Sequence, residues 1–225
     1  MIRGASLFVH ANKIDIYYEE YGEGRPFLLL HGNGEDHTLF ADLAASLSST
    51  YHVYALDTRC HGKSTKTATI GYMDMMEDVA AFITALELKK PLLLGFSDGG
   101  ITGLLLAIHY PELLSGMIAC GANTNPQQLK KPFLLFARLA YFFSRDAKYR
   151  MMYTQPDIRS CDLSTIQTPV LLLAGTRDVL PVSTTMQIAA SIPGSQCTIL
   201  EKQTHISYIR HSERVLQAIQ PFLKE

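Results

Sequence analysis

Short apolar runs recur along this chain, and segments with helical periodicity separate them. The runs lie at residues 27–30, 53–56, 92–94, 117–120 and 170–174, and a further strand is predicted at 197–200. Because they do not alternate with polar residues, they suit strands that are buried on both faces, as in a parallel sheet. Strands that alternate with helices at this spacing predict an α/β fold built on a doubly wound sheet.

The segments between these runs carry helical patterns. Residues 74–88 repeat apolar side chains at a spacing that gives one buried face. Residues 101–109 stop just before Tyr110-Pro111, as helices usually do ahead of a proline. Residues 186–192 and 214–223 are further candidates. Near the N-terminus, the alternating segments 6–10 and 14–18 predict an antiparallel hairpin at the start of the sheet.

Composition narrows the class of protein. The 225 residues are 47% hydrophobic and carry a formal net charge of −1, which predicts one globular domain over 1–225. A balance this close to neutral argues against a nucleic-acid partner and against a membrane partner. The N-terminus lacks the pattern of a signal peptide. We therefore expect a cytoplasmic monomer or homodimer.

The cysteines give no sign of a metal site or a disulfide framework. They are far apart, with no C-x-x-C pair and no histidine at zinc-site spacing, so we predict no metal. We expect them to be buried or half-buried thiols in a reducing compartment. They are Cys60, Cys120, Cys161 and Cys197.

One interval interrupts the alternation of strand and helix. Residues 125–168 contain no buried strand, and 132–143 are apolar nearly all round at helical spacing. This pattern predicts a short helical cap inserted into the domain, although an ordinary crossover helix would look alike. The cap aromatics Phe133, Phe136 and Phe142 are candidates for an apolar substrate pocket. Packing of the cap onto the body is the alternative.

The motif Gly95-Phe96-Ser97-Asp98-Gly99 lies between a predicted buried strand and a predicted helix. A G-x-S-x-G motif in that context places the serine on a strained turn, where side chains at the two glycines would collide with the backbone. The turn also directs the N-terminus of the following helix, which favours negative charge, at the reacting group. Ser97 is therefore the candidate nucleophile.

A serine hydroxyl needs a base, and the base needs an orienting acid. Asp178 follows the strand predicted at 170–174, and His205 follows the strand predicted at 197–200. Because the carboxyl ends of such strands line one crevice, we predict that Asp178 and His205 complete a catalytic triad with Ser97. The weaker candidates are Asp157, Asp162 and His211.

A second glycine-bearing turn, His31-Gly32-Asn33-Gly34, follows the strand predicted at 27–30. We expect the backbone N–H groups of Asn33 and Asp98 to form an oxyanion hole, with a plain glycine-rich turn as the alternative. His31 is expected to be structural. The Asp98 side chain either faces the pocket and attracts a cationic substrate group or only complements the helix dipole.

With these motifs in place, the sequence resembles the α/β-hydrolase superfamily along essentially its whole length. The segment 57–64 is similar to the family's D-x-R-G-H-G-x-S loop, with Cys60 where glycine is usual. The segment 95–101 resembles the valacyclovir-hydrolase (biphenyl hydrolase-like) group. The resemblance implies the α/β-hydrolase fold and a serine triad that needs no cofactor.

These observations predict a serine hydrolase that cleaves an ester-type bond of a small molecule through an acyl-enzyme intermediate. Carboxylic esters, thioesters and lactones are the candidate substrates, each with an acyl group. The same triad also serves cofactor-free perhydrolase or haloperoxidase chemistry and carbon–carbon bond hydrolysis. A non-catalytic ligand-binding module is the alternative outside enzymes, but such modules usually lose part of the triad.

Overall fold

A mixed sheet forms the centre of the molecule. The structure is a computed structural model that describes residues 5–210 and 212–224, and within them the strand order is β1-β2-β4-β3-β5-β6-β7-β8. The strands are β1 (Ala5–Ala11), β2 (Ile14–Tyr21), β3 (Arg25–Leu30), β4 (Tyr51–Leu56), β5 (Leu92–Phe96), β6 (Gly116–Cys120), β7 (Val170–Arg177) and β8 (Gln196–Thr204).

The pairing confirms the predicted architecture. β1 and β2 form the expected antiparallel hairpin, and β2 pairs antiparallel with β4. Every other pair of neighbouring strands in this sheet is parallel. The unbroken apolar runs form the central strands: the side chains of residues 27–30 are fully buried, because helices cover both faces.

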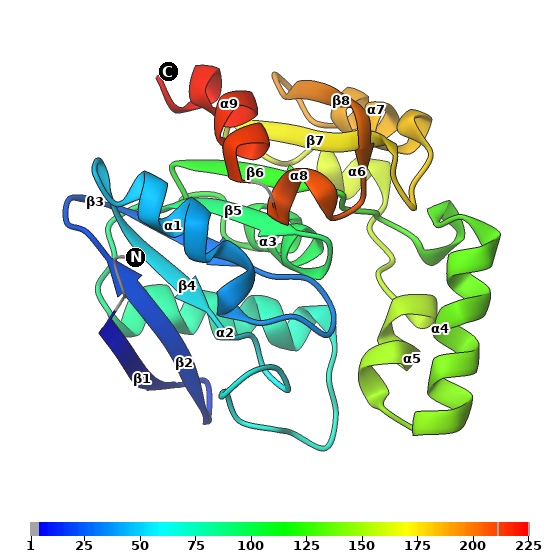
Figure 1. The fold of residues 1–225 in the computed structure, drawn as a ribbon, viewed down its shortest axis with the longest axis horizontal. Helices are drawn as coiled ribbons and strands as arrows, with labels where there is room; N and C mark the ends of the chain where they lie inside the picture. Colours follow the sequence, from blue (N-terminus) through cyan, green and yellow to red (C-terminus); the bar gives the residue numbers. More distant parts are fainter. Residues whose placement is uncertain (1–4, 211, 225) are drawn as a thin grey trace.

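Helices lie on both faces of the sheet (Figure 1). One face packs against α2 (Tyr72–Ala85), α3 (Asp98–His109) and α7 (Val182–Ser191). The other face packs against α1 (Ala41–Leu47), α8 (Ser207–Arg210) and α9 (Ser212–Leu223). The sequence patterns predicted α2, α3, α7 and α9 to within a few residues at either end. They missed the short helices α1 and α8, which lack a full apolar repeat.

Between β6 and β7 the chain leaves the layered body. It forms η2 (Pro126–Gln128), α4 (Lys131–Ser144), α5 (Ala147–Thr154) and α6 (Ser160–Leu163). Helices α4 and α5 lie side by side at one end of the molecule (Figure 1), with the rings of Tyr141 and Tyr153 6.1 Å apart. The helix predicted at 132–143 is α4. That this segment acts as a cap remains a prediction.

The cysteines differ in part from the expectation. All four are free, with Cys120 buried and Cys60 half-buried, but Cys161 and Cys197 are exposed. Cys60 has φ 64°, the left-handed backbone that the family pattern fills with glycine. In the part of the chain that the structure describes, no helix has the length and apolar character to cross a membrane.

Candidate active site

Ser97 lies on the strained turn that the motif predicts. It joins β5 to α3 with φ 52° and ψ −113°, an uncommon backbone for a residue other than glycine. The turn leaves no room for side chains on either side. A Cβ at Gly95 would lie 2.1 Å from the carbonyl oxygen of Gly99, and one at Gly99 would lie 2.2 Å from that of Leu30. The two glycines are therefore required by the close approach of the backbone.

Three predicted side chains come together at this turn. Nε2 of His205 lies 3.1 Å from Oγ of Ser97, and Nδ1 lies 2.6 Å from Oδ1 of Asp178. The Asp178 side chain is fully buried, and that of His205 is 18% exposed. Oδ1 of Asp178 also accepts a bond from the Leu180 N–H at 3.3 Å. The carboxylate thus holds the imidazole with its other nitrogen toward the serine.

The sheet brings these groups together although 108 residues separate Ser97 from His205. Ser97, Asp178 and His205 each follow directly on a parallel strand, β5, β7 and β8, so all three lie at the same edge of the sheet. Gly121 follows β6 with φ 61°, and a Cβ there would lie 2.8 Å from Cε1 of His205. A glycine at the end of the intervening strand therefore leaves space for the imidazole.

The glycine-bearing turn after β3 contacts the serine. A Cβ at Gly32 would lie 3.0 Å from Cβ of Ser97, so the adjacent Asn33 lies beside the candidate nucleophile. Asp98 is the first residue of α3, where backbone N–H groups have no partner within the helix. Asp98 thus follows Ser97 in the chain and Asn33 follows Gly32, and that their N–H groups form an oxyanion hole stays a prediction.

The Asp98 side chain is placed both to face the cavity and to complement the dipole of α3. It occupies the first turn of α3, and it also lines the cavity with Ser97 and His205. Its Oδ1 accepts a 2.8 Å bond from the hydroxyl of Tyr72, and the side chain of Asn33 also interacts with this carboxylate. Burial raises the pKa of Asp98 to about 6.

The cavity at Ser97 is narrow. Only about 10 Å³ of it is wide enough for the centre of a water molecule. The residues around it, besides Ser97, Asp98 and His205, are Tyr72, Gly121, Asn123, Leu129, Phe133, Met152 and Val179. Of the three predicted pocket aromatics, Phe133 lines the cavity. Phe136 and Phe142 instead lie on the outer face of α4, 54% and 61% exposed, because the helix turns only its opposite face toward the body.

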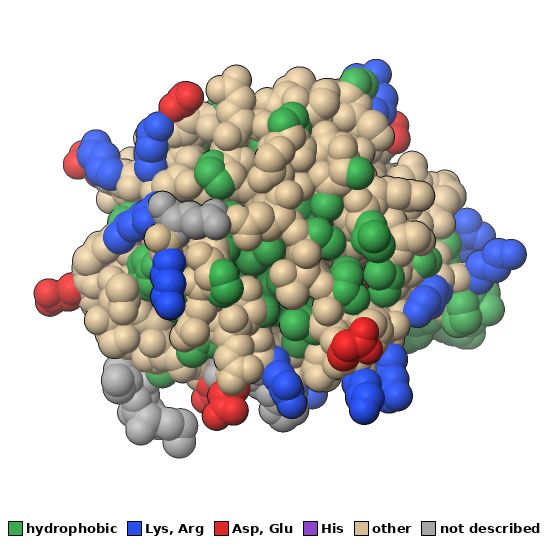
Figure 2. All heavy atoms as spheres, turned by 90° about the horizontal axis from the view of Figure 1, so that it is seen from above, with side chains coloured by type: hydrophobic (Ala, Val, Ile, Leu, Met, Phe, Trp, Pro, Cys, Tyr) green, Lys and Arg blue, Asp and Glu red, His purple; other side chains and the backbone are tan. Residues whose placement is uncertain are grey.

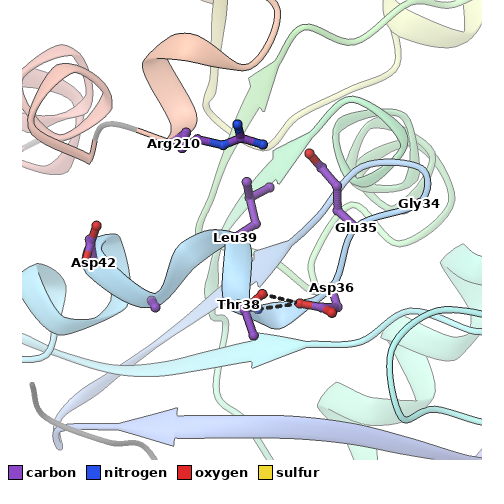
Figure 3. A pocket seen from close by; sticks show the side chains of 8 residues that line it. Gly34, Glu35, Asp36, Thr38, Leu39, Asp42 and Arg210 are labelled. Atoms are coloured by element: carbon purple, nitrogen blue, oxygen red, sulfur yellow. Dashed lines mark hydrogen bonds between the residues drawn. The ribbon is translucent and has the colours of Figure 1, made fainter.

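Glu35 is a feature of the site that the sequence analysis did not single out. Its Oε2 accepts a 3.1 Å bond from the Gly32 N–H, and burial raises its pKa. Glu35 and Arg210 face each other across a polar cavity of about 400 Å³ (Figure 3). In the sequence, Glu35 could have been noticed because it directly follows the His31–Gly34 turn. Its bond to the Gly32 N–H, however, depends on the conformation of that turn.

His31 and Asp162 make contacts away from the catalytic triad. Nδ1 of the fully buried His31 lies 2.7 Å from the Gly32 carbonyl oxygen, and its Nε2 accepts a 3.1 Å bond from the Thr58 N–H. It is structural, as expected. Asp162 pairs with Arg159 at 3.0 Å on the surface. His211 lies outside the described residues.

One group of side chains in the described ranges has the composition of a metal site. The ligand atoms of Asp36, His37 and Asp57 lie within 4.8 Å of one another. However, Nδ1 of His37 is hydrogen-bonded to Oδ1 of Asp57 at 2.7 Å, and the Lys63 N–H donates to Oδ2 at 2.8 Å. These bonds hold the 57–64 loop in place, so the cluster has a structural role without a metal ion.

Comparison with known proteins gives consistent matches. The family model described as alpha/beta hydrolase fold matches residues 25–150. Human "Serine hydrolase BPHL" is 28% identical over an alignment that covers 97% of this chain and 86% of the human protein. "Pimeloyl-[acyl-carrier protein] methyl ester esterase" from Aliivibrio salmonicida is 26% identical and covers 93% of this chain and 96% of its own. The human relative confirms the resemblance carried by residues 95–101.

A solved structure agrees at the level of the fold. The enol-lactonase from Burkholderia xenovorans LB400 superposes with a TM-score of 0.82 at 19% identity, covering 97% of this chain and 100% of that one. At this identity the likeness establishes the shared architecture alone.

Proposed function

Because the chain belongs to the α/β-hydrolase fold family, we propose that it is a serine hydrolase that cleaves an ester-type bond of a small molecule. The contact between Ser97 and His205, 3.1 Å long and backed by Asp178, is the observation that carries this proposal. The two curated relatives, a serine hydrolase and a methyl ester esterase by name, support the ester-cleaving class (EC 3.1).

The proposed reaction proceeds through an acyl-enzyme. Oγ of Ser97 attacks the ester carbonyl carbon while Nε2 of His205 takes its proton, and Asp178 stabilises the imidazolium. The tetrahedral oxyanion accepts hydrogen bonds from the N–H groups of Asn33 and Asp98, and its collapse expels the alcohol, which takes the proton from His205. Water activated by His205 then releases the acid and regenerates Ser97.

We propose a cap role for α4 and α5, on the basis of the narrow cavity. Phe133 of α4 and Met152 of α5 line the space in front of Ser97. Because that space is small, these side chains must move apart to admit an acyl group. Carboxylic esters, thioesters and lactones all fit this description, and a panel of the three at matched acyl length separates them.

Asp98 narrows the substrate class further. A buried carboxylate that lines the cavity directly beside Ser97 favours a substrate that carries a positive charge near the scissile bond. Asp98→Asn should then lower kcat/KM for an amine-bearing ester and leave a neutral ester of the same size unchanged. Equal effects on both esters would exclude this role.

The decisive experiment uses Ser97→Ala. The variant should lose turnover of a short p-nitrophenyl ester and labelling by a fluorophosphonate, because both reactions need the hydroxyl. Ser160→Ala, at an exposed serine on α6, is the matched control and should behave as the parent. Persistence of both reactions in Ser97→Ala would overturn the proposal.

A further inference from the structure

Helix α4 turns its apolar side chains outward. A helix on a globular protein normally faces its apolar stripe to the core. In α4, Ala137 is the one buried side chain. The exposed large side chains, with their exposed fractions, are Leu135 58%, Phe136 54%, Leu139 48%, Phe142 61% and Phe143 80%. Their spacing of three or four residues places them on one side of the helix, which we call the outer face of α4.

The opposite side of α4 accounts for its packing within the protein. Tyr141 meets Tyr153 of α5, and Phe133 points into the cavity at Ser97. The outer face is not needed for either contact. The ring of Phe136 lies 6.1 Å from that of Tyr149 on α5, but all five large apolar side chains keep about half or more of their surface exposed, an arrangement that marks interaction surfaces.

Basic residues are concentrated in the chain segment that contains α4. Between positions 130 and 150 the single acid is Asp146, which gives a charge of +5 against −1 for the whole chain. Figure 2 shows Lys and Arg side chains beside hydrophobic ones at the right edge, where α4 lies in Figure 1. The cations of this interval are Lys130, Lys131, Arg138, Arg145, Lys148 and Arg150. Lys130 donates to the carbonyl oxygen of Asp178 and Lys148 pairs with Asp146, so among the described residues the other four carry the unpaired positive charge of the segment.

We propose that the outer face of α4 docks on a lipid surface that contains anionic headgroups. Apolar side chains on one face of a helix with Lys and Arg at its margins are the features that hold a helix in the plane of a bilayer interface. Lys131 and Arg138 are exposed and flank the apolar stripe, so both can reach the headgroups while the rings enter the acyl boundary.

The charge distribution favours lipid over a second copy of the chain. Two copies that met through this face would bring Lys131 and Arg138 of each copy together, and like charges across an interface oppose association. An anionic bilayer offers the opposite charge, and its fluid acyl region accommodates protruding rings without a preformed groove. Docking would place α4 between the lipid surface and the cavity, which Phe133 lines from the opposite side of the helix.

Vesicle co-sedimentation tests the proposal independently of any enzymatic activity. The parent protein should bind vesicles of phosphatidylcholine with about one-third phosphatidylserine, and bind pure phosphatidylcholine at least about tenfold more weakly. Leu135→Gln/Phe143→Gln removes two exposed apolar side chains while keeping a good helix former and should lower the partition constant at least about tenfold. Met186→Gln, 57% exposed on α7, is the matched control and should bind as the parent does.

Charge variants test the second part of the proposal. Lys131→Gln/Arg138→Gln should weaken binding to anionic vesicles about tenfold or more and reduce its dependence on salt. Unchanged circular dichroism and thermal melting confirm that each variant is folded. No binding to anionic vesicles, or equal binding to neutral ones, would overturn the proposal. So would a dimer in solution that Leu135→Gln/Phe143→Gln dissociates without any vesicle binding by the parent, since the face would then join copies of the chain.

Discussion

The hydroxyl of Tyr72 donates a 2.8 Å hydrogen bond to Oδ1 of Asp98, and both side chains are buried. Asp98 directly follows Ser97, so this pair supports the turn that holds the candidate nucleophile. Burial raises the pKa of Asp98 to about 6 and that of Tyr72 well above its usual range. One buried acid beside the serine therefore changes its charge near neutral pH.

Asp98 should make the free energy of unfolding depend on pH. Its folded pKa of about 6 exceeds the value near 3.9 of an unfolded aspartate, so the folded state holds the proton more tightly. The resulting stability is full below about pH 4 and is lost as pH rises through 6, a change of about 3 kcal/mol. Urea unfolding of the parent and of Asp98→Asn between pH 4 and 8 measures it.

The difference between the two proteins is the informative quantity, because other carboxylates contribute equally to both. Tyr72→Phe is the companion variant. This variant removes the hydroxyl that donates to the ionised Asp98 carboxylate, which should raise the pKa of Asp98. The midpoint of the stability difference should therefore move to higher pH. A difference curve that is flat from pH 4 to 8 would contradict the assignment.

Phe133 should limit the size of the acyl group. Because it lines a cavity that barely admits water, Phe133→Ala should raise kcat/KM for long or branched p-nitrophenyl esters about tenfold relative to the acetate. Phe136→Ala, on the outer face of α4, is the matched control and should leave this ratio unchanged. The opposite ranking of the two variants would show that Phe136 contacts the substrate.

Gly95 should tolerate no side chain. Gly95→Ala places Cβ against the backbone of Gly99, which cannot yield without opening the turn, so we expect a loss of about 3 kcal/mol or more in the free energy of unfolding. At Gly34, with φ 76° and no atom within 4 Å of a Cβ, alanine should cost only about 1 kcal/mol. Chemical denaturation compares the two, and equal losses would refute the steric argument.

Cys60 offers a test of backbone strain outside the site. Its φ of 64° suits glycine and is unfavourable for a β-branched residue. Cys60→Val should therefore be less stable than Cys60→Gly by about 1–3 kcal/mol, although valine is the more apolar of the two. Thermal melting of the pair measures the difference. A valine variant as stable as the glycine variant would mean that the turn relaxes.

Sequence patterns predicted the sheet and the candidate triad because both depend on local features. The apolar runs identify the central buried strands, and Ser97, Asp178 and His205 each directly follow the end of a strand. The edge of a parallel sheet then brings them together whatever the details of the loops. The motif also predicted the strain at Ser97, since only glycines can flank such a turn.

Other features depend on contacts that no local pattern contains. The hydrogen bond between Tyr72 and Asp98 joins residues 26 positions apart, and no sequence pattern near Tyr72 predicts it. The direction of α4 was equally hidden, because a helix that is apolar nearly all round does not reveal which face turns outward. For the same reason Phe136 and Phe142 looked like pocket residues. The net charge near zero of the whole chain also gave no sign of the positively charged segment 130–150.

The position of β8 has a consequence for how the protein loses activity on heating. β8 is the last strand in the sheet order and pairs with β7 alone, and His205 is attached to its end. The free energy of local unfolding is lower for a strand at the edge of a sheet than for a central strand. Warming should therefore displace His205 before the central strands unfold. Catalytic activity should then be lost some degrees below the temperature at which the rest of the sheet unfolds.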